Sequence, residues 1–215
     1  MKNQFWRDHY KNFNLSDPSK FAQFCLSKYV KKNDTVVELG CGNGRDGFEI
    51  CKLVKQYYGL DLSNEAISSF NDYIINTSNS DYKNVTLKCI DFTNIDFNQF
   101  AEKDLILYSR FSLHSINYNE SDLLFKNIEK IKINSWKMFI EVRTIFDPLY
   151  GQGKNIGLHE YKTDHYRRFI DPVQFIDFLN KFFSIKYFEL SEDFAPYENQ
   201  SPKVMRIIIG PNQGK

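Results

Sequence analysis

Three glycines that directly follow a short apolar segment constrain this chain more than any other feature. The apolar segment is typical of a buried strand, and the apolar spacing of a helix resumes after the glycines. Gly40, Gly42 and Gly44 let the backbone turn sharply and approach a ligand without a side-chain clash. A dinucleotide-binding fingerprint would need its third glycine at position 45, where the chain has Arg45. The spacing therefore predicts a strand–turn–helix unit whose ligand is not a dinucleotide pyrophosphate.

Strand-like and helix-like segments alternate over most of the chain, which is typical of a largely parallel sheet with helices on both faces. The predicted strands cover residues 35–39, 56–61, 84–90, 104–109, 136–143, 183–190 and 203–209. The predicted helices cover residues 19–30, 46–55, 63–76, 120–131 and 171–181. Since no helix separates the last two strands, we expect an antiparallel hairpin at one edge. We expect the first strand at the centre, because ligands bind where the strand order reverses.

Length and composition exclude several classes of protein. A chain of 215 residues that is 42% hydrophobic, with 20 Phe and 13 Tyr, fits one soluble domain with a large core. Its 28 Lys and Arg against 27 Asp and Glu argue against a dedicated nucleic-acid-binding protein, whose surface would be basic. No apolar run approaches the ~20 residues of a membrane span, and the N-terminal segment lacks the apolar stretch of a signal peptide. We therefore expect a cytoplasmic protein with no membrane insertion.

The cysteines carry no signature of a disulfide framework or of a metal centre. Cys25, Cys41, Cys51 and Cys89 form no C-x-x-C pair and no cluster with histidines. Disulfide frameworks belong to short secreted chains, and zinc sites need close ligand spacings. We expect four reduced thiols and no bound metal.

Residues 38–46 resemble the E/D-x-G-x-G-x-G motif of the class I S-adenosylmethionine (SAM)-dependent methyltransferases. The resemblance implies a Rossmann-like fold with a seven-stranded, mostly parallel sheet. It also implies that SAM is the methyl donor and that S-adenosylhomocysteine is a product. In an order like that of the family, acids follow the second and third predicted strands, and a polar segment, residues 108–110, ends the fourth.

The resemblance implies a role for each of these positions. Asp61 would hold the ribose hydroxyls, since a carboxylate offers two acceptors at once, and Leu62 would lie beside the adenine. Asp91, paired with Phe92, would accept from the adenine amino group, and residues 108–110 would border the methionine portion. The implied cofactor-binding residues are Glu38, Gly40, Gly42, Asn43, Gly44, Asp46, Asp61, Leu62, Asp91, Phe92 and Ser109.

A narrower likeness extends along the chain. Residues 18–24, 38–46, 108–115, 149–153 and 164–170 resemble small methyltransferases encoded among bacterial capsule and surface-polysaccharide genes, of the phosphoramidate-modification type. This likeness implies O-methylation of a phosphoramidate- or phosphate-bearing precursor of a capsular polysaccharide. The acceptor would be a small anion and could be linked to a nucleotide.

Arginines and histidines gather where an acceptor should bind. Only seven arginines occur, and four of them follow the fourth or fifth predicted strand or lie in the segment 145–170. The planar fork of arginine suits bidentate binding of phosphate or carboxylate. The predicted catalytic residues are Arg110, His114, Arg143, His165 and Arg168, and of the neighbours Arg167 and Arg168 we expect only one to reach the ligand. The alternative is that the arginines make structural ion pairs with Glu38, Asp46, Glu141 or Asp164.

Two segments are expected to cover the site within a single domain of residues 1–215. The N-terminal segment, about residues 1–34, is predicted to form a helical lid in which Trp6, Tyr10 and Phe13 fold over the cofactor. Ordinary packing of these rings against the first helix is the alternative. Residues 145–170 do not continue the alternation of strands and helices, and we interpret them as an insert on the substrate side of the sheet. We expect this insert to bring Tyr150 and Tyr166 towards the acceptor.

The chemistry of the acceptor decides whether a base is needed. Methyl transfer from a sulfonium mainly requires that donor and acceptor are aligned and water is excluded. An oxyanion acceptor is already ionised near pH 7, whereas a sugar hydroxyl would need His114 or His165 as a base.

Other functions remain as alternatives. A nucleic-acid methyltransferase would carry an Asn/Asp-Pro-Pro-aromatic motif after the fourth strand, where this chain has Tyr-Ser-Arg-Phe. A non-catalytic partner protein need not keep the glycine loop and both strand-end acids.

Overall fold

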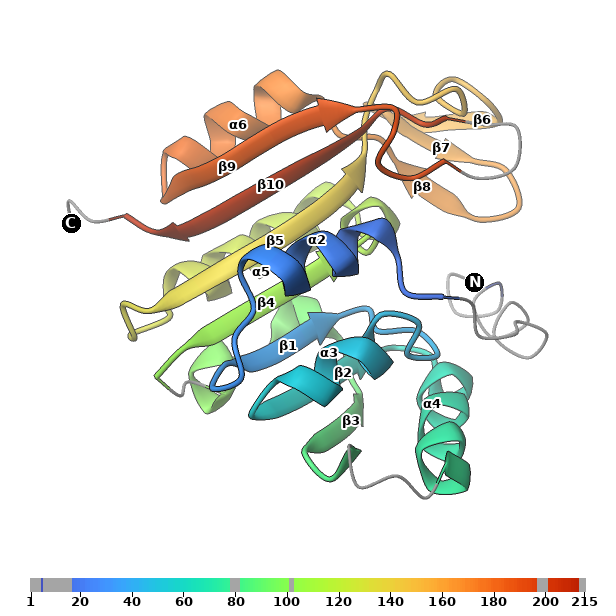
Figure 1. The fold of residues 1–215 in the computed structure, drawn as a ribbon. Helices are drawn as coiled ribbons and strands as arrows, with labels where there is room; N and C mark the ends of the chain where they lie inside the picture. Colours follow the sequence, from blue (N-terminus) through green and yellow to red (C-terminus); the bar gives the residue numbers. More distant parts are fainter. Residues whose placement is uncertain (1–4, 6–16, 78–81, 101–102, 197–200, 213–215) are drawn as a thin grey trace.

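A computed structural model of the chain describes residues 5, 17–77, 82–100, 103–196 and 201–212. Its centre is a seven-stranded sheet with the strand order β3-β2-β1-β4-β5-β10-β9 (Figure 1). The strands are β1 (Thr35–Leu39), β2 (Gln56–Asp61), β3 (Val85–Cys89), β4 (Leu105–Arg110), β5 (Trp136–Arg143), β9 (Phe183–Ser191) and β10 (Val204–Pro211). β1 lies between β2 and β4, so the predicted central place of the first strand is confirmed.

The direction of the strands also agrees with the sequence prediction. β1 to β5 pair in parallel, whereas β10 runs antiparallel to both β5 and β9. The last two strands therefore form an antiparallel hairpin whose second strand lies against β5 and whose first strand is the edge of the sheet. The predicted Rossmann-like fold with a mostly parallel sheet is confirmed.

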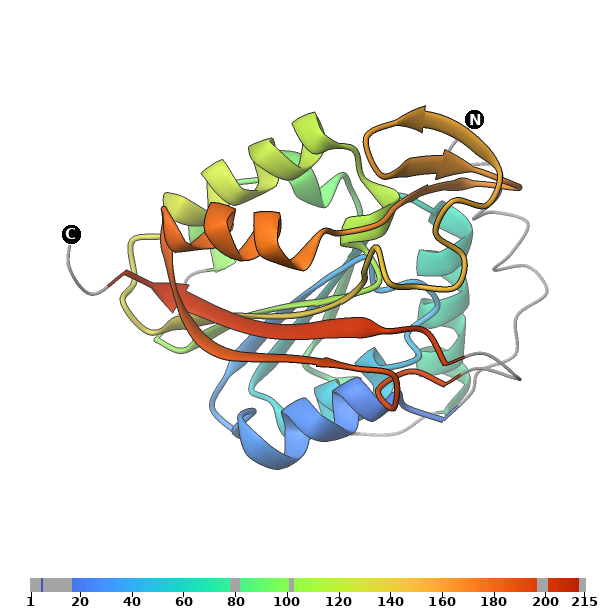
Figure 2. The same cartoon turned by 90° about the horizontal axis from the view of Figure 1, so that it is seen from above.

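Helices cover both faces of the sheet, with α2 on one side and α5 and α6 on the other (Figure 2). They are α2 (Lys20–Lys28), α3 (Gly47–Leu53), α4 (Asn64–Thr77), α5 (Tyr118–Glu129) and α6 (Pro172–Asn180). α2, α3 and α4 bury Phe21, Phe48 and Phe70 in one core, and α5 and α6 bury Phe125 and Phe175 in the other. Within the described ranges, no helix is both long and apolar enough to cross a bilayer.

Capping residues set where the helices begin. Ser19 caps α2 by accepting a hydrogen bond from the amide of Ala22. Asn117 caps α5 in a reciprocal box with Glu120, whose side chain accepts from the Asn117 amide. The predicted start of this helix at residue 120 was two residues late, because Glu120 is the third residue of the helix rather than its first.

Residues 145–170 leave the sheet and return to it at one place. Ile145 and Ile170 are tied by a backbone hydrogen bond of 3.0 Å, and the Ile170 amide also donates to the Arg143 carbonyl at the end of β5. Between them lies a small antiparallel sheet of β6 (Lys154–Gly157), β7 (Glu160–Lys162) and β8 (Tyr166–Arg168). It packs against the short 3-10 helix η4 (Leu113–Ser115) that follows β4. The three strands were not predicted, because strands of three or four residues leave little periodicity to detect.

All four cysteines are free thiols, as the sequence predicts. Cys25, Cys41 and Cys51 are buried, and burial raises the pKa of each thiol. These thiols are therefore protonated near neutral pH and act as small apolar core residues.

Candidate functional site

A cavity of about 510 Å³ lies at the carboxyl ends of the parallel strands and is bordered by the insert. This is where the sequence analysis expected a ligand. The predicted site residues that line it are Glu38, Gly40, Gly42, Asn43, Asp46, Asp61, Leu62, Asp91, Phe92, Arg110, His114, Arg143 and His165. Gly44, Ser109 and Arg168 do not line it.

The glycine loop after β1 needs its glycines for two reasons. Gly40, Gly42 and Gly44 have φ values of +76°, +55° and +89°, which side-chain-bearing residues rarely adopt. A Cβ on Gly40 would approach the Ser112 Cβ to 2.9 Å at the cavity, whereas a Cβ on Gly44 would meet the Phe70 ring at 2.7 Å. The predicted place of Gly44 on the cavity wall is therefore wrong. Its missing side chain makes room for α4 instead.

The two strand-end acids are held in place before any ligand binds. Asp61 accepts hydrogen bonds from the Gly42 amide (2.9 Å) and the Ser63 amide (2.8 Å), and its burial raises the pKa of this carboxyl. Asp91 accepts from the amide and the hydroxyl of Thr93 at 2.9 and 2.7 Å. Both carboxylates therefore reach the cavity as fixed acceptors.

Two more acids lie where the glycine loop meets β4 and α2. Asp46 accepts three hydrogen bonds: from the Ser19 amide (2.7 Å), the Ser19 hydroxyl (2.8 Å) and the Tyr108 hydroxyl (2.7 Å). Glu38 accepts from Tyr57, and burial, followed by the charge of Asp46, holds the pKa of the Glu38 carboxyl well above its usual range. The links from Asp46 to Ser19 and Tyr108 span 27 and 62 residues, and no local sequence signal reveals them.

Ser109 was predicted to bind the cofactor, but it is fully buried and bonded to Ser112 (2.6 Å between the hydroxyl oxygens). Successive side chains of a strand point to opposite faces. Since Arg110 lines the cavity, its neighbour Ser109 does not. Ser112, beyond the strand, borders the cavity, as do Ser63 and Ser115.

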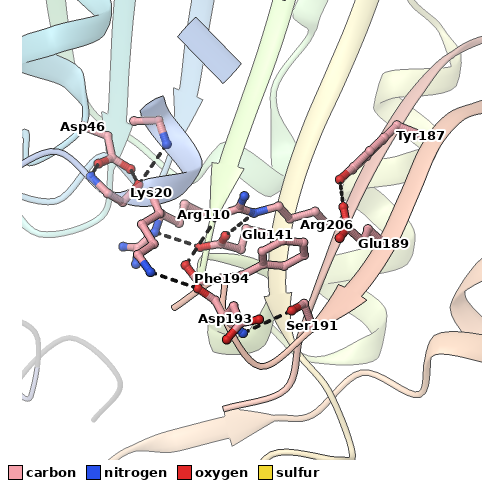
Figure 3. Close-up of polar contacts among 12 residues, drawn as sticks. Lys20, Asp46, Arg110, Glu141, Tyr187, Glu189, Ser191, Asp193, Phe194 and Arg206 are labelled. Atoms are coloured by element: carbon pink, nitrogen blue, oxygen red, sulfur yellow. Dashed lines mark hydrogen bonds and ion pairs between the residues drawn. The ribbon is translucent and has the colours of Figure 1, made fainter. Parts of the chain in front are cut away.

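Of the arginines that line the cavity, Arg110, Arg143 and Arg167 each form an ion pair with a protein carboxylate. The Arg110 Nε lies 3.0 Å from Glu141, whose other oxygen is 2.7 Å from Arg206, so two guanidinium groups share one buried carboxylate (Figure 3). The Arg143 Nη1 lies 2.6 Å from Asp147. The Arg167 Nη1 lies 3.4 Å from Asp164 and 2.7 Å from the Thr163 hydroxyl. The alternative of structural ion pairs therefore applies to all three, although Asp147 was not among the predicted partners.

Arg168 was predicted as a catalytic residue, but its position does not fit that role. It is 2% exposed, donates to the Leu113 carbonyl (3.3 Å) and lies over the Tyr118 ring. Arg167 reaches the cavity instead, because neighbouring side chains of β8 alternate between faces. The expectation that only one of the pair faces the ligand site is thus correct.

The two tyrosines of the insert do not line the cavity, contrary to expectation. Tyr150 bonds through its hydroxyl to the His159 Nδ1 (2.8 Å), and Tyr166 donates to Glu160 (2.7 Å). They stabilise the small sheet rather than the ligand site.

The two histidines predicted at the site have different environments. Burial, and then the charge of Arg143, holds the pKa of His114 well below its usual range, so this ring is neutral near pH 7. The His165 Nδ1 lies 2.9 Å from Asp164, and its ring stacks on Phe5 with centroids 4.0 Å apart. Burial opposes ionisation of Asp164, but the Thr163 hydrogen bond and the charge of His165 outweigh it and lower the pKa of this carboxyl. Asp164 thus holds the His165 ring in a fixed orientation.

The predicted lid falls mostly outside the described residues. Trp6, Tyr10 and Phe13, the rings assigned to it, are among residues 6–16, which the structure does not describe. Phe5 is described and lines the cavity.

The comparisons with known proteins agree with this geometry. Residues 30–132 match the family model described as a methyltransferase domain. The fold is similar to that of the CcbJ methyltransferase from Streptomyces caelestis (TM-score 0.71, 13% identity, 98% of this chain and 99% of that one). It is also similar to that of the glycopeptide N-methyltransferase MtfA in complex with SAM (TM-score 0.66, 15% identity, 91% and 95% of the two chains). The chain is therefore similar to methyltransferases over residues 30–132 and shares its overall fold with solved methyltransferases.

The chain spans only a third or less of the length of the curated relatives that it matches. The mRNA cap guanine-N(7) methyltransferase of Eremothecium gossypii is 33% identical over 75 residues, which are 34% of this chain and 16% of that protein. Ribosomal RNA small subunit methyltransferase A of Clostridium botulinum is 33% identical over 97 residues, 45% of this chain and a third (33%) of that protein. These matches therefore support the domain and not the acceptor.

The cavity fits SAM chemically. Gly40 leaves room for a ligand against Ser112, and Asp61 and Asp91 supply fixed acceptors for hydroxyl and amino groups. Leu62 is 48% exposed beside them and offers an apolar surface to a base. The Asn43 amide nitrogen is buried at the wall and has no hydrogen-bond partner in the described part of the chain. Such a group is satisfied when a polar ligand binds.

Proposed function

We propose that this methyltransferase domain transfers the SAM methyl group to a small anionic acceptor in the cytoplasm. The acceptor we propose is a phosphoramidate- or phosphate-bearing precursor of a capsular polysaccharide, methylated on oxygen. The narrower sequence likeness described above suggests this acceptor class, and the charge on one wall of the cavity supports it.

The observation that carries the proposal is that guanidinium groups face the cavity while their paired carboxylates are buried behind them. The side chains of Arg110 and Arg143 are 17% and 19% exposed and line the cavity. The side chains of their partners Glu141 and Asp147 are fully buried (0% exposed) and do not line it. The cavity therefore meets guanidinium groups, while the neutralising carboxylates lie behind them. An anion can therefore approach Arg110 and Arg143 without meeting the carboxylates paired with them, whereas Asp164, the partner of Arg167, itself lines the cavity.

Arg167 and His165 line the same cavity from the insert, and the pKa of the neighbouring His114 is depressed. After burial, the charges of Arg143, His165 and Arg167 are the main causes of that depression. Arg143 and Arg167 therefore lie close enough to His114 to disfavour its protonation. We therefore place the anionic acceptor beside Arg143, Arg167 and His114.

Methyl transfer requires little from the protein beyond the alignment of donor and acceptor. SAM supplies a methyl group already activated on a sulfonium. Arg143 and Arg167 would orient the acceptor oxygen towards it, and Phe5 and Phe111, which also line the cavity, would help to exclude water. Because a phosphoramidate or phosphate oxygen is ionised near pH 7, no base has to remove a proton.

A sugar hydroxyl is the second candidate acceptor, because the site holds a neutral histidine. In the described part of the chain, the buried His114 Nδ1 has no hydrogen-bond partner. A neutral imidazole nitrogen can accept a hydroxyl proton, and His165 beside Asp164 is the alternative base.

Incubation with labelled SAM tests the proposal. The acceptors to compare are a nucleotide-linked sugar phosphoramidate, the same sugar without that group, a free sugar and RNA, with mass detection of the product. We expect methylation of the phosphoramidate. Methylation of the free sugar would establish the second candidate, and methylation of RNA alone would overturn both.

A matched pair of variants locates the acceptor. Arg143→Lys keeps the positive charge but loses the planar guanidinium that can bind an oxyanion through two nitrogens. We therefore expect about tenfold slower methylation of the acceptor, with unchanged SAM affinity. Lys154→Gln removes an exposed charge from β6 and should alter neither. Equal acceptor use in wild type and Arg143→Lys would contradict the placement.

A further inference from the structure

The turns before four neighbouring strands form one edge of the sheet, at the end of the molecule opposite the cavity (Figure 1). In the pairing register, the first residue of β1 lies beside the first residues of β2 and β4, and the first residue of β4 lies beside that of β5. Backbone hydrogen bonds tie the turns together. The Lys55 amide donates to the Asp34 carbonyl (3.0 Å). The first amide of β1 donates to the Asp104 carbonyl (2.9 Å), and the first amide of β4 donates to the Ser135 carbonyl (3.1 Å).

This edge carries a row of exposed lysines, which we call the lysine edge. It consists of Lys31, Lys32, Lys55, Lys103, Lys130 and Lys132. Among the described residues, Lys32, Lys103 and Lys132 make no ion pair. The formal charge of only +1 gives no sign of such a row, because its members come from four turns that only the fold brings together.

The nearest acids of these turns point away from solvent. Asp34 is 6% exposed, and its carboxylate accepts a hydrogen bond from the Lys31 amide (2.7 Å). Asp104 is partly buried and accepts from the Ser135 hydroxyl (2.5 Å). Long lysine stems carry their ammonium groups beyond such carboxylates. In the described part of this edge only Asp96 and Glu129 are exposed acids, so the solvent meets a net positive surface.

The chemistry of the lysine edge favours a diffuse anionic surface over a nucleic acid. None of the described arginines lies in these turns, and lysine is a point charge without the fork that recognises a single phosphate. The large exposed aromatic side chains in the described residues, Tyr73, Tyr118, Phe146 and Phe188, also lie outside these turns, so bases would find no stacking platform. Separate point charges in a row match a surface of many anionic headgroups.

We propose that the lysine edge binds the surface of a bilayer that contains anionic lipids. The attraction is electrostatic and places the amino ends of the strands against the headgroups. Because the cavity lies at the carboxyl ends of the same strands, it opens away from the bilayer and stays accessible to a soluble acceptor. This inference goes beyond the proposed function and does not depend on the identity of the acceptor.

Sedimentation of the chain with lipid vesicles tests the inference. Vesicles of phosphatidylcholine with about a third of phosphatidylglycerol present an anionic surface, whereas vesicles of phosphatidylcholine alone do not. We expect the wild type to bind the anionic vesicles only. In about 0.5 M NaCl this binding should weaken by about tenfold or more, because salt screens exposed charges.

Two triple variants with the same loss of charge locate the binding surface. The first removes one charge from each of three turns of the lysine edge: Lys32→Gln, Lys103→Gln and Lys132→Gln. The control removes three exposed charges at the other end of the molecule: Lys20→Gln, Lys154→Gln and Lys162→Gln. We expect the first variant to bind anionic vesicles about tenfold more weakly than wild type, or weaker still. The control should stay within about twofold of wild type, because its charges lie beyond the screening length.

Each remaining outcome would overturn the inference. If the wild type does not bind anionic vesicles, or if both variants weaken binding equally, the lysine edge is not a bilayer-binding surface. If the wild type binds single-stranded RNA and not vesicles, and the first variant loses this binding, the partner is a nucleic acid instead. The salt dependence of the wild type needs no variant, so the test does not rest on the folding of either one.

Discussion

At the scale of single residues, Asp61 is the sharpest test of the cofactor site. Its carboxylate is fixed by the Gly42 and Ser63 amides, so the ribose hydroxyls would meet a preorganised acceptor. Asp61→Ala should weaken SAM binding by about 1–3 kcal/mol, the usual loss for a hydrogen bond to a charged group. Titration calorimetry measures this loss, and Asp177→Ala, an exposed carboxylate on α6, is the control. Unchanged affinity in a folded Asp61→Ala protein would remove Asp61 from the site.

Residue positions at strand ends were predictable, whereas side-chain pairings were not. Asp61 and Asp91 could be placed because the end of a parallel strand is marked by a local change from apolar to polar residues. The ion pair between Arg143 and Asp147 could not be predicted, because it depends on a turn at the start of the insert. Ser109 and Arg168 were misplaced for a related reason: which face a residue takes depends on the exact register of a short strand.

At the scale of elements, Asp46 joins α2 to the glycine loop. Ser19 both caps α2 and donates to Asp46, so Ser19→Ala removes a helix cap and leaves a buried carboxylate with fewer donors. We expect a loss of about 1–3 kcal/mol in the free energy of unfolding. Denaturant titration measures it, with Ser27→Ala, exposed near the end of α2, as the control. Equal stabilities of the two variants would contradict the structural role of this link.

The elements themselves were largely predictable. Alternating strands and helices, together with the missing helix before β10, predicted a mostly parallel sheet with a central first strand and an antiparallel hairpin at one edge. The full strand order was not predicted. The small sheet of the insert was not predictable, because its three strands are short and partly exposed and its packing on η4 joins residues far apart in the chain.

At the scale of the whole molecule, stability should fall in mildly acidic solution. His114 has a pKa below that of a histidine in the unfolded chain. In mildly acidic solution the unfolded chain therefore binds a proton at this residue, whereas the folded chain does not. The stability contributed by neutral His114 is present above about pH 6.5 and falls by about 1.4 kcal/mol per unit as pH drops below that value. Wild type should therefore lose about 1 kcal/mol more than His114→Asn between pH 7.5 and 5.5. Equal losses in denaturant titrations would show that His114 titrates normally.

The central claim is that the cavity at the strand ends holds SAM, and binding of the two forms of this cofactor tests it most directly. Titration calorimetry of the wild-type chain with SAM, S-adenosylhomocysteine, NAD and NADP needs no knowledge of the acceptor. We predict that SAM and S-adenosylhomocysteine each bind once per chain and that Asp61→Ala weakens both. We predict no binding of NAD or NADP, since the third glycine of the dinucleotide fingerprint is replaced by Arg45. Binding of a dinucleotide in place of SAM would contradict the account.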